Sequence, residues 1–146
     1  MVRLSHSIDF LTRVEVTVDV QLLKSKIHQA RITHAELYYE GSLAIDLDLM
    51  DAVGLMPWEK ILVVNITNGQ RLETYAIPGQ RGSRVFCLNG SAARRGAPGD
   101  RITIMSFAQV PMDAAPTHSP RVAVLDAQNN IIEVKQPPSV GEFGVS

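Results

Sequence analysis

A glycine–serine pair at positions 41 and 42 could carry out chemistry on the backbone itself. The serine hydroxyl can attack the preceding carbonyl carbon and convert the amide into an ester. β-Elimination then splits the chain and leaves dehydroalanine, which hydrolyses to a ketone. Gly41 suits this reaction because it has no Cβ, which permits unusual backbone angles and leaves its carbonyl unhindered. The attack also needs stored strain and a donor for the developing oxyanion. The pair by itself is not diagnostic, because Gly82-Ser83 and Gly90-Ser91 repeat it.

The segments around this pair form an ordered set of motifs. Residues 32–42 read ITHAELYYEGS, and the other segments are KSKIH at 24–28, NITNGQR at 65–71, TYAI at 74–77, RGSR at 81–84 and LNGSAA at 88–93. In this order and spacing they resemble the pyruvoyl-dependent aspartate 1-decarboxylase family, which makes β-alanine for pantothenate synthesis. The resemblance runs from about Val18 to about Ala127.

The resemblance implies a fold, a cofactor and an assembly. The fold is mainly β, a small double-psi β-barrel with a few short helices. Ser42 becomes a pyruvoyl group by self-cleavage after Gly41, which leaves chains 1–41 and 42–146, and Thr74 donates a hydrogen bond to the Gly41 carbonyl. The ketone forms a Schiff base with the amine of L-aspartate, and loss of carbon dioxide gives β-alanine. The pocket lies between neighbouring subunits of a homotetramer, and some relatives require a maturation partner.

The resemblance also assigns residues to the substrate. Arg71 and Lys26 match positions near the substrate carboxylates, and the planar fork of an arginine suits bidentate carboxylate binding. Tyr75 matches the proton donor to the carbanion, placed with Arg71 across a subunit boundary from the pyruvoyl group. A tyrosine hydroxyl can protonate a carbanion while it stays protonated itself at neutral pH. Without the resemblance, Arg71 and Lys26 read as solvated cations and Tyr75 as an amphipathic core tyrosine.

Other positions match the pocket wall. Asn89 matches the residue whose amide holds the pyruvoyl end, and the backbone of Gly90, Ser91 and Ala92 lines the same pocket. Supporting positions, for which a purely structural role is the alternative, are His28, Tyr39, Ile77 and Val64. The chain departs from the family pattern at Ser91, where alanine is common, and at Val64, where tryptophan is common. Neither departure removes a group that the chemistry requires.

Alternating and β-branched apolar stretches predict the many short strands that would position these residues. The expected strands span residues 13–20, 61–66, 71–77, 84–88, 101–110, 121–126 and, more weakly, 131–134. Asn68-Gly69 predicts a hairpin turn between the second and third of these. Residues 46–53 predict a short helix that Gly54 ends, and residues 89–95 predict a second helical turn. Taken alone, this pattern fits a small closed barrel or a sandwich.

The length of 146 residues predicts one domain. We expect an N-terminal extension at 1–17, a barrel domain at 18–135 and a flexible C-terminal tail at 136–146. The extension is either an added edge strand or the product of a gene start placed too far upstream. The lone cysteine, Cys87, lies in an apolar run and reads as a buried, inert thiol in a reducing compartment. No apolar run is long enough to span a bilayer, which predicts a cytoplasmic protein.

Other functions have weaker support. A formal net charge of -1 argues against a nucleic-acid-binding barrel and against an anionic membrane as partner. The histidines lack ligand spacing, so no metal site is expected. The main alternative to the decarboxylase is an uncleaved barrel that acts as a binding or assembly module, because a fold does not determine a function. The residues whose joint presence favours the enzyme are Lys26, Arg71, Thr74, Tyr75 and Asn89.

Overall fold

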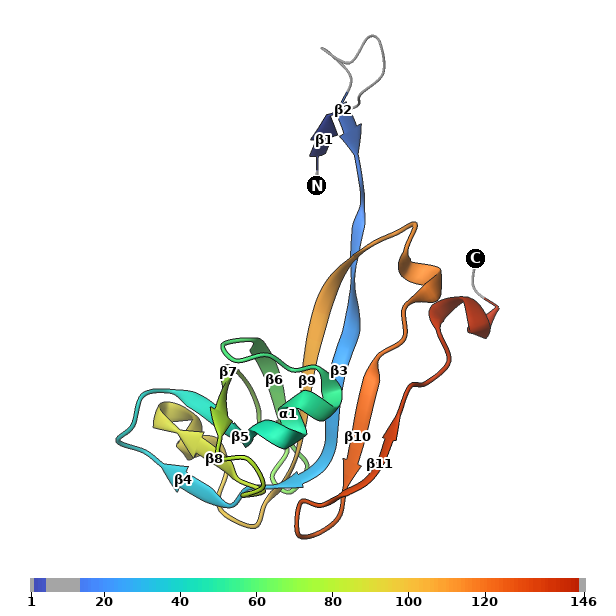
Figure 1. Cartoon of the computed structure of the whole chain (residues 1–146). Helices are drawn as coiled ribbons and strands as arrows, with labels where there is room; N and C mark the ends of the chain where they lie inside the picture. Colours follow the sequence, from blue (N-terminus) through green and yellow to red (C-terminus); the bar gives the residue numbers. More distant parts are fainter. Residues whose placement is uncertain (1, 5–13, 145–146) are drawn as a thin grey trace.

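The computed structural model describes residues 2–4 and 14–144 (Figure 1). Within these residues, a nine-stranded sheet curls around an apolar core, and a two-stranded sheet projects from it. The strand order of the large sheet is β11-β10-β3-β9-β6-β7-β5-β8-β4. The sheet mixes three parallel pairs (β3 with β10, β4 with β8, β5 with β7) with antiparallel ones, which is consistent with a double-psi barrel. None of the helices in this part of the chain is long and apolar enough to cross a membrane.

The elements are short apart from two long strands. The small sheet pairs β1 (Val2–Leu4) with β2 (Val14–Val16). The large sheet contains β3 (Asp19–Arg31), β4 (His34–Glu36), β5 (Ser42–Asp46), β6 (Lys60–Asn65), β7 (Arg71–Gly79), β8 (Phe86–Asn89), β9 (Arg101–Pro111), β10 (Arg121–Leu125) and β11 (Ile131–Lys135). The helices are α1 (Leu47–Val53) and three 3-10 turns, η1 (Gly90–Arg95), η2 (Ala115–Thr117) and η3 (Val140–Phe143). The prediction of a mainly β fold with few short helices is confirmed.

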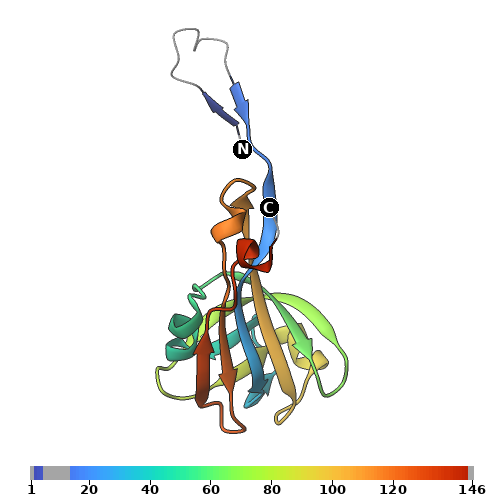
Figure 2. The same cartoon turned by 90° about the vertical axis from the view of Figure 1, so that its right-hand side faces the viewer.

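The core lies inside the curled sheet and under α1. Successive strand side chains point to opposite faces, so alternate residues such as Ile61 and Val63 on β6 are buried. Leu49 and Met50 of α1 close the core from one side. Figure 2 shows the strands wrapping around this interior. The apolar alternation that predicts the strands is therefore the same pattern that builds the core.

Local signals locate most of the elements correctly. The helix predicted at 46–53 is α1, and Gly54 ends it in the left-handed conformation at φ 71°. The hairpin predicted at Asn68-Gly69 joins β6 to β7. The turn predicted at 89–95 is η1. Backbone chemistry within a few residues determines each of these features.

The strand predicted at 13–20 is wrong as a single element. The described part of this stretch divides into β2, which ends at Val16, and β3, which begins at Asp19. Strand β3 then continues to Arg31, with register shifts against β9 between Leu23 and Ser25 and between Ile27 and Ala30. These irregularities disrupt the two-residue period, which explains why the sequence pattern did not reveal the length of β3.

The two ends of the chain have different surroundings. The predicted extension falls partly outside the described residues, which omit 1 and 5–13. At the other end, the Val140 amide donates to the His118 carbonyl at 3.1 Å, and Ser139 and Glu142 form a capping box. The flexibility of 136–146 stays a prediction, and its last two residues lie outside the described part.

Asp46 connects the end of β5 to the loop before β8. Its buried carboxylate accepts hydrogen bonds from the backbone amides of Asp48, Gly82 and Arg84 at 2.7–3.0 Å, and the Arg84 guanidinium lies 3.3 Å away. Burial alone would raise the pKa of Asp46, but the three amides and Arg84 outweigh it and lower the pKa below its ordinary value. The stabilisation is therefore present above the ordinary pKa of an aspartate and is lost as the pH falls through the lowered value.

We expect Asp46→Asn to lower the free energy of unfolding at pH 7 by about 1–3 kcal/mol, because charge-assisted hydrogen bonds are lost. Urea denaturation at pH 7 measures this difference, and it should shrink at a pH low enough to protonate Asp46 in the parent chain. Asp113→Asn, at an exposed aspartate, is the control and should leave the midpoint unchanged. Equal stability of the parent and Asp46→Asn chains at pH 7 would contradict this account.

Candidate active site

Ser42 lies at the first position of β5, directly after the turn that contains Tyr39 and Gly41. Strand β5 pairs with β7 on one side and with β8 on the other, and Ser42 stands opposite Asn89 of β8. The Ser42 side chain is 1% exposed. This serine is therefore buried where β5 pairs with β8, although the turn before it reaches the surface.

Asn89 holds the Ser42 hydroxyl. Its side-chain nitrogen donates to Ser42 Oγ at 2.9 Å, and its side-chain oxygen accepts from the Cys87 thiol at 3.2 Å. Cys87 is half-buried rather than buried. Burial and, to a smaller extent, Glu36 raise the pKa of the Cys87 thiol, so the sulfur keeps its proton at neutral pH and can donate. Asn89 thus contacts residue 42 directly through this hydrogen bond, as its predicted role requires.

Gly90 brings the next segment against the turn. It has φ +67°, and a Cβ built on it would lie 2.7 Å from the Tyr39 carbonyl oxygen and 2.8 Å from the Gly41 nitrogen. Both the backbone angle and the close approach require glycine here. The helical turn η1 consequently begins directly beside Gly41, which places Ser91 and Ala92 next to the glycine–serine pair.

Gly41, Thr74, Ser91 and Ala92 line one pocket of about 400 Å³, here called the cleavage pocket. Its other lining residues are Leu72, Glu73, Arg94 and Arg95. Four residues predicted from three separate motifs therefore meet in one place. The sequence interpretation did not connect Arg94 and Arg95 with this site, and their position directly after the LNGSAA motif was the available signal.

Thr74 and Tyr75 lie on opposite faces of β7. Thr74 shares its face with the buried Ala76, whereas Tyr75 shares the other with Ile77. Ile77 stands opposite Ala44 of β5, so Tyr75 and Ile77 occupy the same face of the sheet as Ser42 and Ala44. Within one chain, Tyr75 is therefore on the side of the sheet that presents the Ser42 hydroxyl.

Tyr75 stacks on Trp58, with ring centroids 5.8 Å apart and an interplanar angle of 28°. Trp58 is largely exposed and has a positive φ of 72°. It precedes β6 in a loop, and no sequence motif connected it to Tyr75. This contact restricts the orientation of the Tyr75 ring and places the exposed Trp58 ring beside it.

Arg71 lies at the start of β7 and is exposed. It stands opposite Val64 of β6, so these two predicted residues are neighbours. Arg71 is four residues before Tyr75, which corresponds to about 13 Å along an extended strand. Arg71 and Ser42 of the same chain are therefore displaced along the strand direction, even though both belong to predicted motifs.

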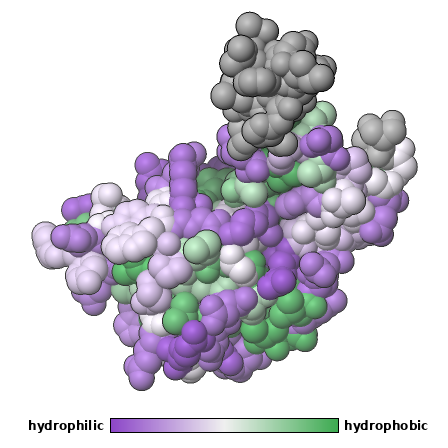
Figure 3. All heavy atoms as spheres, turned by 45° about the horizontal axis from the view of Figure 1, so that its top comes forward, coloured by the Kyte–Doolittle hydropathy of each residue, from purple (hydrophilic) through white to green (hydrophobic). Residues whose placement is uncertain are grey.

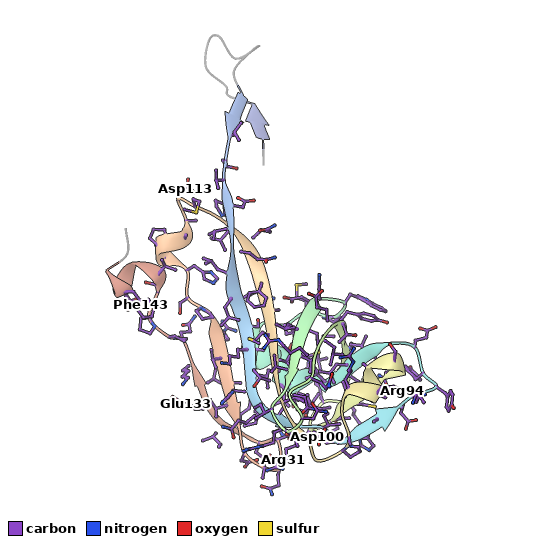
Figure 4. The ribbon with its side chains drawn as sticks, turned by 180° about the vertical axis from the view of Figure 1, so that it is seen from behind. Arg31, Arg94, Asp100, Asp113, Glu133 and Phe143 are labelled. Atoms are coloured by element: carbon purple, nitrogen blue, oxygen red, sulfur yellow. The ribbon has the colours of Figure 1, made fainter. Side chains whose placement is uncertain are left out.

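Lys26 and His28 lie elsewhere, on β3, where they line a second pocket of about 460 Å³, here called the β3 pocket. The two pockets share no lining residue. Arg94 of the cleavage pocket and Phe143 of the β3 pocket lie on opposite sides of the molecule (Figure 4). The predicted residues therefore form two groups on one chain and do not converge on a single site.

The surroundings of His28 favour its neutral form. Its Nδ1 lies 3.3 Å from Thr103 Oγ1. Burial first, and then the positive charges of Lys26, Lys135 and Arg101, lower the pKa of His28. The imidazole is therefore mainly uncharged at neutral pH. Among the described residues, no group of three or more histidine, cysteine, aspartate or glutamate side chains is arranged to hold a metal ion.

Comparison with known proteins identifies similar chains. The family model described as aspartate decarboxylase matches residues 18–132. A protein of Salinibacter ruber is 48% identical over 118 residues, which cover 81% of this chain and 81% of the relative. A protein of Tolumonas auensis is 51% identical over 79% of this chain and 91% of its own length, and one of Bacillus licheniformis is 54% identical over 77% and 89%. All three relatives carry the name aspartate 1-decarboxylase.

We expect Gly90→Ala to lower the free energy of unfolding by about 2–4 kcal/mol, because a methyl group there combines positive-φ strain with a backbone clash. The matched control is Gly54→Ala, which has a similar φ of +71° and nothing within 4 Å of the added carbon, so it should cost only about 1 kcal/mol. Chemical denaturation measures both. Equal losses in the two variants would remove the close approach to the turn as the reason for glycine at position 90.

Proposed function

The chain belongs to the aspartate decarboxylase family, and from this membership we propose that it converts L-aspartate to β-alanine and carbon dioxide for pantothenate synthesis, using a pyruvoyl group made from Ser42. The observation that carries the proposal is the buried Ser42 hydroxyl, which accepts a hydrogen bond from Asn89 directly after Gly41. Cytoplasmic location, as a biosynthetic enzyme, is part of the proposal.

The residues around position 42 fit a pyruvoyl group. Asn89 directs an N–H donor at this residue, and the cleavage pocket beside Gly41 leaves space for the chain end that cleavage would release. A pyruvoyl group supplies the electron sink for the electron pair left behind when carbon dioxide departs.

The chain itself would carry out the cleavage. Ser42 Oγ attacks the Gly41 carbonyl carbon, the C–N bond breaks, and the acyl group moves to oxygen as an ester. Removal of the Ser42 α-proton expels the Gly41 carboxylate and leaves dehydroalanine, and water then releases ammonia and leaves the ketone. Thr74 is the proposed donor to the oxyanion, supported by its place with Gly41 in the cleavage pocket.

Arg71, Lys26 and Tyr75 have the proposed substrate roles. Arg71 and Lys26 bind the substrate carboxylates, and Tyr75 donates the proton that replaces carbon dioxide. Tyr75 would act with Arg71 across the subunit boundary, on the pyruvoyl group of a neighbouring copy, and the stacking on Trp58 would orient its ring. Asn89 would hold the pyruvoyl end, and the backbone of Gly90, Ser91 and Ala92 would line the same pocket. Ile77 and Val64 are proposed wall residues, and His28 and Tyr39 have proposed supporting roles.

The separation of the predicted residues supports a homotetramer. Arg71 is displaced along the strand direction from Ser42 of its own chain, and Lys26 opens into the β3 pocket, so a second copy would be needed to bring these cations to Ser42. Apolar side chains such as Phe107, 44% exposed, reach the surface, and Figure 3 shows apolar areas among polar ones. A maturation partner is a further proposal, which coexpression would test.

We expect purified protein to consist of two fragments, 1–41 and 42–146, with a ketone at position 42. Ser42→Ala should give one folded, inactive chain, because alanine has no oxygen that can attack or leave. Intact-mass spectrometry measures both outcomes. Ser83→Ala, in another glycine–serine pair, is the control and should be cleaved like the parent. Decarboxylase activity in Ser42→Ala would disprove the pyruvoyl mechanism.

We expect Arg71→Ala to be cleaved normally but to raise KM for aspartate roughly ten- to hundredfold, because a bidentate hydrogen bond to a carboxylate is lost. Steady-state kinetics measures the change. Arg121→Ala, an exposed arginine at the start of β10, is the control and should leave KM unchanged. Unchanged kinetics in Arg71→Ala would exclude Arg71 from carboxylate binding.

A further inference from the structure

The residues after β11, 136–144, are here called the C-terminal segment, and they contribute part of the β3 pocket. Strands β3, β10 and β11 lie side by side, with the C-terminal segment continuing from β11 (Figure 2). Val122 and Val124 of β10 line the pocket together with Lys26 and His28, and Pro137 and Phe143 line it from the C-terminal segment. The remaining charged lining residue is Lys135, the last residue of β11.

The strand register places Lys135 beside Lys26. Val122 stands opposite Lys26 on one side and opposite Lys135 on the other, so all three side chains leave the same face of the sheet. Two strand spacings separate the lysine Cα atoms by about 10 Å, and both long side chains can bend over Val122. His28 stands opposite Val124 in the neighbouring row. Three basic groups therefore surround two valines.

These cations have no negative partner in the described part of the chain. Neither Lys26 nor Lys135 takes part in any of its ion pairs, and no carboxylate lines the pocket. Glu133 stands opposite Val124 but is exposed and outside the lining. The pKa of His28 falls partly because of Lys26 and Lys135, so the histidine experiences both positive charges. A bound anion would offset this repulsion.

Several contacts hold the C-terminal segment in this position. The Ser119 hydroxyl donates to the Pro137 carbonyl, and the Val140 amide donates to the His118 carbonyl at 3.1 Å. Ser139 and Glu142 cap the turn η3. All of these C-terminal residues follow residue 132, where the match to the family model ends. Lys135 therefore lies just beyond the matched region and lines a pocket that also contains Lys26 and His28 from the family motif.

We propose that Lys135 is a further substrate-binding residue, which with Lys26 binds one carboxylate of a small dicarboxylate in the β3 pocket. The inference rests on the proposed function, in which Lys26 lies near a substrate carboxylate. Two ammonium groups on one face bind a carboxylate more tightly than one does. The valine and proline side chains that line the pocket suit the short carbon chain of such a molecule.

The test uses the uncleaved Ser42→Ala chain and succinate, a dicarboxylate without an amine, so binding does not depend on the pyruvoyl group. Isothermal titration calorimetry should show that Lys135→Gln raises the Kd about two- to fivefold, the size expected for one exposed ion pair. Lys135→Arg and the control Arg121→Gln should leave the Kd unchanged. In the cleaved enzyme, Lys135→Gln should raise KM for aspartate by a similar factor with kcat unchanged.

An unchanged Kd in Lys135→Gln, or failure of every chain to bind succinate, would overturn the inference. Inorganic phosphate bound as tightly as succinate would overturn its dicarboxylate assignment. Failure of the proposed function would look different, because the parent chain would then remain uncleaved or leave aspartate unchanged. Succinate binding that depends on Lys135 would still be measurable in that case.

Discussion

The hydrogen bond between Asn89 and the buried Ser42 hydroxyl is the contact on which the site depends. A buried hydroxyl without a partner costs about 1–3 kcal/mol, so the pairing of β5 with β8 that brings these residues together also makes the serine tolerable inside the protein. The next residue, Gly90, must then turn away at once, and its positive φ allows this beside the Gly41 backbone. One contact thus connects the strand register, the glycine and the cleavage pocket.

The distribution of the remaining groups follows from the curled sheet. Strand β3, with Lys26 and His28, is separated from β5 by β9, β6 and β7 in the strand order. Under the proposed function, this separation suits an enzyme in which one copy supplies the cleaved serine and another supplies cations. The last residue of β11, Lys135, joins this cationic group, so a residue beyond the family match would also act on the substrate.

Much of the fold follows from local patterns. The hairpin at Asn68-Gly69, the helix ended by Gly54 and most strands are specified by residues only a few positions apart. The length of β3 is not, because its register shifts interrupt the alternation. Trp58 was missed for a different reason, because its stacking on Tyr75 joins a loop to a strand through the tertiary fold. The local periodicity of apolar residues carries no information about a contact between distant segments.

The sequence by itself determined which residue types are present and in which order, including three glycine–serine pairs and the motifs around the first of them. It also determined that Thr74 and Tyr75 point to opposite faces, because strand geometry alone requires this. The tertiary structure decided which of the three serines is buried and hydrogen-bonded. Ser83 and Ser91 are exposed, whereas Ser42 is buried against Asn89, 47 residues away in the chain. Burial and hydrogen bonding between distant residues arise only when the sheet closes, so no neighbouring sequence could specify them.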